Sequence, residues 1–251
     1  MDNSSIEYHI IKPEKSLADC IQFFWRLSNS SGDAKKVIIL PDGYFDIIFY
    51  SVDGSPFEGL LVGLSSEPTS YTILPNSITY AISFKLPAAE QVIQTKIANI
   101  LNGQAKLGHQ YWNLAWDQVS DFKTFAKIVT EKITGIRMPE TDHRKQELFQ
   151  VIYERAGLVT VQEIAGTIHW SSRQINRYFN EWFGITLKKY CTILRYRASF
   201  KDIRDGKLFP EDHYTDQAHF IKEIKKFTGV TPKDLSRNKD DRFIQFSTLP
   251  D

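Results

Sequence analysis

The stretch SSRQINRYFNEWFGIT, residues 171–186, is the most informative about the second half of the chain, because a later stretch repeats its pattern. DQAHFIKEIKKFTGVT, residues 216–231, aligns with it at a constant offset of 45 residues. The matched positions are Arg177 with Lys222, Phe179 with Ile224, Gly184 with Gly229, and Thr186 with Thr231. Each copy predicts a short helix that ends at glycine and is followed by a threonine cap. Two copies of one helical unit favour a long, repetitive ligand, and double-stranded DNA is the usual one.

The residues before the first copy predict a helix-turn-helix, in which a short turn joins two helices. Thr160 and Glu163 form a capping box that opens the first helix, and Ser171 and Gln174 form a second box that opens the next. We expect the motif to cover residues 161–182. The second helix of such a motif enters the major groove of DNA, where its first turns contact the base edges.

The predicted recognition helix of the first copy has two different faces. Its apolar face recurs at spacings of three and four, which predicts burial, and carries Ile175, Tyr178, Phe179 and Trp182. The opposite face carries Ser172, Arg173, Asn176, Arg177 and Asn180. Arginine can bond both acceptors of guanine, and asparagine both edge groups of adenine, so this face is predicted to contact DNA. An ordinary solvated polar face is the alternative interpretation.

The second copy predicts a weaker hydrogen-bonding face. Its buried stripe is Phe220, Ile224 and Phe227. The groove-facing positions are Gln217, Ala218, Ile221 and Lys222. Glutamine and lysine can contact bases, and alanine or isoleucine can contact the methyl group of thymine.

Helical patterns continue through the rest of the second half, at 144–156, over a long segment 187–206, and from Pro232 onward. Basic residues outside the recognition faces are expected to bind phosphates, which sets affinity without reading sequence. They are Lys188, Lys189, Arg195, Arg197, Lys201, Lys225, Lys226 and Lys233. Plain solvation is the alternative for about half of them, and Arg195 or Arg197 could instead pair with a carboxylate in the core.

The formal net charge of +1 hides an asymmetry between the two halves. Residues 1–140 hold 12 Lys and Arg against 15 Asp and Glu, a net charge of −3. Residues 144–239 hold 18 against 11, a net charge of +7. A basic second half beside a mildly acidic first half favours a polyanionic partner for the second half alone.

The first 86 residues predict β-structure, because short apolar runs alternate with Gly, Pro and Ser-rich breaks. The runs are VIIL (37–40), YFDIIFY (44–50), GLLVGLS (59–65), SYTIL (70–74) and ITYAISFKL (78–86). This spacing indicates a β-sandwich or barrel. Helices are expected from Pro87 to Gly103 and over 121–133, and a linker over 135–143.

Several classes of protein lack support in the sequence. The sequence contains no run of 18 apolar residues, so it predicts no membrane span. The polar start MDNSSIEYH does not resemble a secretory signal. Cys20 and Cys191 predict neither a disulfide framework nor a zinc cluster, so we expect a cytoplasmic protein. His9 and His109 share no strand, so no metal site, no catalytic residues and no cofactor are predicted.

Residues 144–239 resemble the AraC-type (AraC/XylS) transcriptional regulators, whose DNA-binding module holds two helix-turn-helix units joined by a long helix. The strings that carry the resemblance are VQEIA, SSRQINRYFNEWFGIT, LRYRAS and DQAHFIKEIKKFTGVTP. The resemblance implies that Arg173, Asn176 and Arg177 contact DNA bases in the first helix-turn-helix, and Gln217, Ala218 and Lys222 in the second.

The first half has a shorter resemblance, carried by LPDGYFDIIF and ISFKLPAAE. These strings look like a domain that precedes the module in such regulators, which implies a cupin-like β-structure that binds a small-molecule effector or forms a homodimer. The resemblance also implies RNA polymerase as a partner. No membrane partner is expected.

Two departures from the family pattern bear on the fold. His169 replaces the usual glycine in the first turn, where a left-handed conformation is favoured. The first helix of the second unit should occupy about 206–213, where Gly206 and Pro210 oppose a helix. We therefore expect an irregular segment there and a less rigidly held second recognition helix.

The sequence thus predicts two domains and a tail. Residues 1–140 form an α+β domain for effector binding or dimerisation, residues 141–239 an all-α DNA-binding domain, and residues 240–251 a polar, loosely held tail. The predicted function is a sequence-specific, effector-responsive transcription regulator. One alternative is a small-molecule sensor that acts through protein contacts and has a degenerate second helix-turn-helix, and another is an enzyme built on the β-domain.

Overall fold

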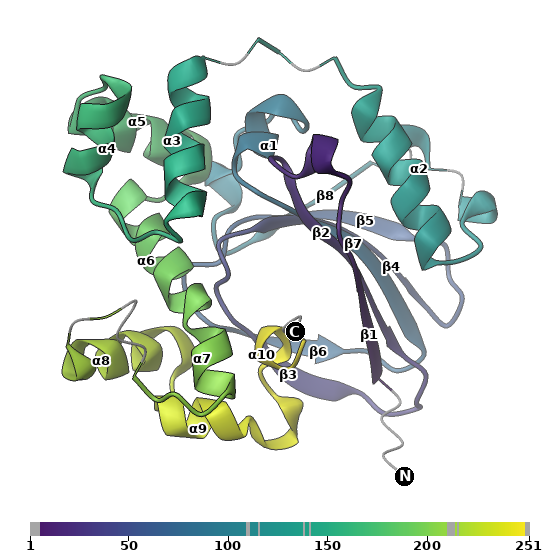
Figure 1. Cartoon of the computed structure of the whole chain (residues 1–251). Helices are drawn as coiled ribbons and strands as arrows, with labels where there is room; N and C mark the ends of the chain where they lie inside the picture. Colours follow the sequence, from purple (N-terminus) through teal and green to yellow (C-terminus); the bar gives the residue numbers. More distant parts are fainter. Residues whose placement is uncertain are drawn as a thin grey trace. The chain divides into compact units, whose positions relative to one another are not determined.

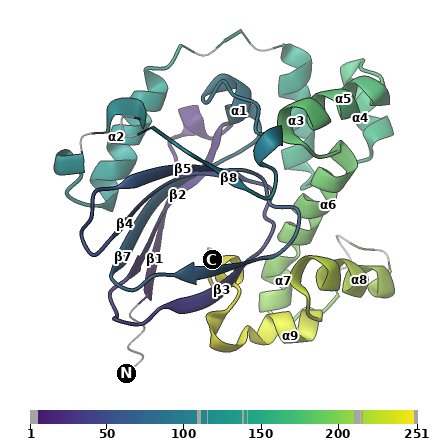
Figure 2. The same cartoon turned by 180° about the vertical axis from the view of Figure 1, so that it is seen from behind.

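The computed structural model describes residues 6–108, 111–114, 116–137, 139–140, 142–209, 214 and 216–248 (Figures 1 and 2). They form two compact units. The sheet unit contains Met1–Lys35, Tyr44–Gly63 and Thr72–Glu140. The helical unit contains Lys36–Gly43, Leu64–Tyr71 and Thr141–Asp251. A single boundary near residue 140 does not account for the two short segments of the first half that join the helical unit.

The sheet unit is built on one antiparallel sheet, which confirms the β-rich first half. Its strand order is β1-β2-β7-β4-β5-β8. The strands are β1 (Ile6–Ile11), β2 (Ile21–Asn29), β4 (Phe45–Val52), β5 (Glu58–Val62), β7 (Ser77–Phe84) and β8 (Gln104–Lys106). Along β4, Phe45, Ile47 and Phe49 are buried and alternate with less buried residues, as expected for a strand with one face in the core.

Helix α2 (Phe122–Thr134) covers a face of this sheet (Figure 1). The side chain of Asp121 caps the helix by accepting a hydrogen bond from the backbone of Thr124. Phe125 stacks on Tyr80 of β7 at a centroid distance of 5.1 Å and contacts the ring of Phe49 edge-on at 6.2 Å. The predicted helix over 121–133 is therefore confirmed, and its apolar side forms part of the core of the sheet unit.

The predicted helix from Pro87 to Gly103 is wrong over most of its length. Only α1 (Pro87–Gln91) and a short 3-10 turn, η2 (Ala98–Ile100), form. The backbone of Gln94 is left-handed, at φ 54°, and the amide of Thr95 donates to the carbonyl of Ala89 at 3.0 Å. These features end a helix, because they satisfy its last carbonyls outside the helical pattern.

The helical unit contains eight helices among the described residues. They are α3 (His143–Glu154), α4 (Val161–Ile168), α5 (Ser172–Phe183), α6 (Leu187–Ala198), α7 (Phe200–Arg204), α8 (Gln217–Thr228), α9 (Pro232–Arg237) and α10 (Ile244–Ser247). In Figures 1 and 2, α3, α4 and α5 gather at one end of α6, and α8 and α9 lie near α7 at the other. The all-α second half is confirmed.

The long helix predicted over 187–206 is interrupted once. It divides into α6 and α7 at Ser199, which is fully buried. The hydroxyl of Ser199 donates to the carbonyl of Tyr196 at 2.7 Å. A serine that bonds to the preceding turn competes with the regular helical pattern, which explains the break.

The prediction of a loosely held tail over 240–251 is wrong for its described residues around α10. Phe243 and Phe246 are buried, and Phe246 packs edge-on against Phe200 at 5.6 Å. Strand β3 (Lys35–Ile39), which pairs with β6 (Thr69–Ile73), also contacts this region. The amide of Ile38 donates to the carbonyl of Arg242 at 2.6 Å. Two aromatic rings in the tail thus complete the core of the helical unit.

Candidate nucleic-acid interface

The first helix-turn-helix forms as predicted, because both capping boxes are present. In α4, the backbone of Thr160 donates to Glu163 at 2.7 Å and the hydroxyl of Thr160 accepts from the backbone of Glu163 at 3.2 Å. Ser171 and Gln174 make the same reciprocal pair at the start of α5. His169 ends α4 with a left-handed backbone, at φ 55° and ψ 34°. The histidine therefore adopts the turn conformation for which glycine is usual.

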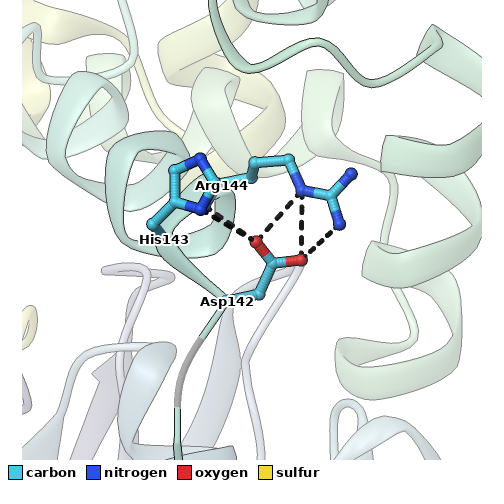
Figure 3. A network of polar contacts seen from close by, with 3 residues as sticks. All are labelled: Asp142, His143 and Arg144. Atoms are coloured by element: carbon cyan, nitrogen blue, oxygen red, sulfur yellow. Dashed lines mark hydrogen bonds and ion pairs between the residues drawn. The ribbon is translucent and has the colours of Figure 1, made fainter.

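One arginine, Arg144, contacts both Asp142 at the start of α3 and Trp170 in the turn of this motif, and Figure 3 shows its contacts with Asp142. Arg144 donates through Nη2 to Asp142 at 2.6 Å and through Nε to the same carboxylate at 3.0 Å. Asp142 also caps α3 by accepting from the backbone of Arg144. The guanidinium lies 5.2 Å from the ring centroid of Trp170, the residue before the Ser171 cap. The contacts of Asp142 and Trp170 with Arg144 were not predicted from the sequence. The only signal was the position of Asp142, an acidic residue before a helix.

The Asp142 carboxylate predicts a pH dependence of stability. The side chain of Arg144 holds the pKa of Asp142 at about 2, below its usual value of 3.8. A carboxylate with a lowered pKa stabilises the fold above about pH 4, and this stabilisation is lost as the pH falls toward 2. The variant Asp142→Asn keeps a capping residue and removes the charge. We expect wild type to have a higher Tm than Asp142→Asn at pH 5, and the difference to shrink by pH 3. A difference that stays constant between these pH values would contradict the assignment.

The buried face of α5 matches the prediction with one exception. Ile175, Phe179 and Phe183 are fully buried, and Tyr178 is nearly so. Trp182, which was predicted to be buried, is half-buried. Phe183 occupies the core instead, because it lies four residues after Phe179 and packs edge-on against that ring at 5.3 Å.

The opposite face of α5 is open to solvent. Arg173, Arg177 and Asn180 are exposed, and Ser172 and Asn176 are half-buried. Among the described residues, no hydrogen bond or ion pair engages the guanidinium of Arg173 or Arg177. Both groups are therefore available to a ligand.

The two asparagines of this face bond to their own helix. Asn176 donates through Nδ2 to the carbonyl of Ser172 at 3.0 Å, and Asn180 donates to the carbonyl of Asn176 at 2.8 Å. Bidentate contact with adenine requires both the donor and the acceptor of an asparagine amide. Ser172 takes one of the two hydrogens on Nδ2 of Asn176, so the second hydrogen and the amide oxygen remain for that contact.

The second recognition helix repeats this arrangement in α8. Asp216 caps the helix, and Gly229 ends it with a left-handed backbone, as Gly184 ends α5. Phe220, Ile224 and Phe227 are fully buried, which confirms the predicted stripe. The predicted contact residues Gln217, Ala218 and Lys222 are exposed, and Ile221 is half-buried.

The segment before α8 lacks the regular first helix of a helix-turn-helix wherever it is described. Residues 205–209 are not helical, and Gly206 has a left-handed backbone at φ 86°. Pro210 and the residues up to 213 lie outside the described residues. A helix that covers all of 207–213 is therefore absent, as the sequence predicted.

Of the basic residues outside the recognition faces, Lys188 is exposed and Lys189 is half-buried at the start of α6. Arg195 has a different role. Its Nη2 donates to Oε1 of Glu223 in α8 at 2.8 Å, which confirms that one arginine of this helix pairs with a carboxylate in the core. Glu223 was not predicted as a functional residue. The sequence did contain a signal for this residue, because Glu223 lies three residues after Phe220, on the buried stripe of α8.

Other chemistry has little support in the structure. Burial raises the pKa of the Cys20 thiol to about 11 and that of Cys191 to about 12, so neither is a reactive thiolate near neutral pH. Within the described part of the chain, no three His, Cys, Asp or Glu side chains gather in a way that could hold a metal ion. None of its helices is long and apolar enough to cross a membrane.

Known proteins resemble different parts of the chain. Residues 9–106 match a family described as "Domain of unknown function (DUF6597)". The uncharacterized HTH-type transcriptional regulator YtdP of Bacillus subtilis (strain 168) is 21% identical over 172 residues, which are 58% of this chain and 22% of that protein. The chain thus spans about a fifth of the length of this relative.

Crystal structures of ToxT from Vibrio cholerae show a low similarity over most of the chain. ToxT from strain O395 gives a TM-score of 0.41 at 10% identity and covers 92% of this chain and 96% of its own. Wild-type ToxT of strain SCE256 with bound unsaturated fatty acid gives 0.38 at 11% identity, with coverages of 92% and 94%. At this level of similarity, no functional argument rests on these structures.

Helices α5 and α8 thus share one arrangement, a capped start, a buried apolar face and an exposed opposite face. The relative that matches the sequence is named a helix-turn-helix transcriptional regulator. Together with the confirmed first helix-turn-helix, this match supports a transcription regulator of the helix-turn-helix type.

Proposed function

We propose that this protein is a sequence-specific DNA-binding transcription regulator, in which α5 and α8 contact successive major grooves. One observation carries the proposal: in both helices an apolar face is buried while the opposite face, with Arg177 in one and Lys222 in the other, is exposed. Recognition helices need this division, because one face must fix the helix while the other contacts base edges.

The charge of the second half supports the same function. Residues 144–239 carry a net charge of +7, which favours a polyanion. Arg173 and Arg177 lie four residues apart on one helical face, so both can enter one groove. Arg173, Asn176 and Arg177 would contact bases in the first groove, and Gln217, Ala218 and Lys222 in the second.

Lys188 should contribute affinity without sequence preference. It is exposed in the first turn of α6, outside both recognition faces. We expect Lys188→Ala to weaken binding to all DNA sequences alike and to reduce the slope of log K against log salt by about 1, as for the loss of one phosphate contact. Both effects are measured by titrations at several salt concentrations, with random DNA and with an operator selected from a random DNA pool. A loss confined to the operator would show that Lys188 contacts a base.

Selection of bound sequences from a random DNA pool, with the full chain, tests the proposed function. We expect an enriched site with two conserved segments about one helical turn apart, or about 10 base pairs. Recovery of random sequences, with no enrichment over several rounds, would contradict sequence-specific binding.

One observation favours the alternative of a sensor that acts through protein contacts. The described residues 205–209 form no helix, so the second helix-turn-helix is irregular. The complete caps and buried stripe of α8 favour a working recognition helix. A gel shift with random DNA fragments separates the two functions, since a sensor without DNA affinity would produce no shift at any salt concentration.

The sheet unit is proposed to bind a small-molecule effector or to form a homodimer. Its strands and α2 enclose aromatic side chains, and Phe57 stacks on Trp116 at a centroid distance of 4.0 Å. Contact with RNA polymerase and a cytoplasmic location follow from the proposed role in transcription.

A further inference from the structure

The ion pair between Arg195 and Glu223 joins the two recognition units at a position where they differ. Glu223 aligns with Tyr178 under the offset of 45 residues. Tyr178 packs in α5 among aromatic rings, including Trp170 at 5.8 Å and Phe149 at 6.3 Å. Its counterpart in α8 is a carboxylate, which is 9% exposed. A buried charge needs a partner, and Arg195 of α6 supplies it at 2.8 Å.

Neighbouring rings shield this pair from solvent. The guanidinium of Arg195 lies 5.1 Å from the ring centroid of Tyr214. The ring of Tyr214 also packs edge-on against Phe220 of α8 at 4.8 Å. Burial, and then the nearby Glu223 carboxylate, raise the pKa of Tyr214, so its phenol stays neutral at physiological pH. The ion pair is therefore held in a partly desolvated environment, where a charged hydrogen bond is stronger than in water.

The contacts of Glu223 reach the exposed side of α8. Its Oε1 atom, which accepts the bond from Arg195, lies 3.5 Å from Nε2 of His219. His219 is exposed, and it lies between the predicted contact residues Ala218 and Lys222 in the sequence. A continuous set of polar contacts thus runs from α6, which lies between the two helix-turn-helix units, to the surface of α8 that is proposed to face DNA.

The second unit has a particular need for such a contact. In the first unit, α4 packs against α5 and supports it. Before α8, the described residues 205–209 form no helix. Apolar contacts such as Tyr196 with Phe227, at 4.7 Å, hold α8 but are not directional. The planar guanidinium imposes direction as well as distance on its partner.

We infer that Glu223 is a positioning residue for DNA recognition: through Arg195 it fixes the rotation of α8 about its own axis, and so determines which side chains reach the bases. This inference rests on the proposed function. Base contacts require placement within about 0.5 Å, so a small rotation of α8 would separate Gln217 and Lys222 from their bases.

The variant Glu223→Gln tests this role, because it keeps the shape and one acceptor oxygen and removes the charge. The full chain is titrated with the selected operator and with two operators in which one half is scrambled. The half contacted by α5 is identified as the one where Arg177→Ala relaxes base preference. For Glu223→Gln we expect about tenfold weaker binding to the intact operator, which corresponds to the loss of one good base contact. Scrambling the α8 half should then have little further effect.

Two readouts separate positioning from general stability. Binding that depends on the α5 half should be unchanged in Glu223→Gln, and the salt slope should stay the same because no phosphate contact is lost. A purely structural role would lower the Tm and weaken both halves together, which would overturn the inference. The matched control is Glu181→Gln, the same change at an exposed position of α5. The effect of Glu181→Gln on binding should be the same for the intact operator and for the operator whose α8 half is scrambled.

A double variant covers the case in which Glu223→Gln does not fold. Arg195→Met with Glu223→Leu removes both charges, so no unpaired charge remains buried. Loss of discrimination at the α8 half with an unchanged Tm would support the inference, and full discrimination would overturn it. If the wild-type chain selects no DNA sequence, the proposed function itself fails. If it reads both halves and the variants do so equally, only the role of Glu223 fails.

Discussion

Replacement of Arg177 by alanine is expected to weaken binding to the selected operator by about 1–3 kcal/mol and to relax base preference at one position. Arg177 is exposed on α5, opposite the fully buried Phe179. Its guanidinium has no partner among the described residues, so its bonds remain available for a base. Titration of operator variants at each position, at one fixed salt concentration, measures both effects.

The control for Arg177 is Arg155→Ala, which removes the same charge at an exposed position after α3. This variant should preserve the pattern of base preferences, because Arg155 lies outside both recognition helices. If Arg177→Ala left both the affinity for the operator and the base preferences unchanged, the assigned role of Arg177 would be wrong.

Replacement of Gly157 by alanine is expected to destabilise the helical unit by about 2–5 kcal/mol. Gly157 follows α3 with a left-handed backbone at φ 77°. A Cβ atom there would lie 2.3 Å from the carbonyl oxygen of Cys191 in α6. The neighbouring atom belongs to the backbone of α6, so it cannot move aside without shifting that helix. Thermal or denaturant unfolding of the variant measures the loss.

Gly229→Ala provides a matched control for Gly157. Gly229 has nearly the same backbone, at φ 75°, but a Cβ atom there would meet nothing within 4 Å. We expect a cost of about 1–2 kcal/mol, from the left-handed conformation alone. If both variants lost the same free energy of unfolding, the close approach of residue 157 to the backbone of α6 would contribute nothing to the requirement for glycine there.

Patterns within a few residues predicted the helical unit well. Capping boxes at Thr160 and Ser171 located the starts of α4 and α5, and Gly184 and Gly229 located the ends of α5 and α8. Such signals are readable because each cap satisfies backbone groups in its own first or last turn. The exposed position of Arg177 followed from helical periodicity, since the apolar stripe must face the core.

Prediction from apolar periodicity failed at two helix breaks and in the tail. The helix expected after Pro87 ends early, and Ser199 divides the helix expected over 187–206. Phe243 was assigned to a polar tail, yet it is fully buried and its backbone pairs with Ile38. The burial of Phe243 depends on contacts between residues far apart in the sequence, whereas the two helix breaks involve hydrogen bonds within six residues that apolar periodicity does not encode.

Helices α5 and α8, their ends and the faces they expose could be predicted from the sequence, because these follow from capping and from a repeat of three to four residues. The pairing of Arg195 with Glu223 and the inclusion of the segment Lys36–Gly43 in the helical unit became visible only in the folded chain. The physical reason is that a charge on a buried stripe can find its partner on any element that folds against it, so the choice is made only when the elements pack together.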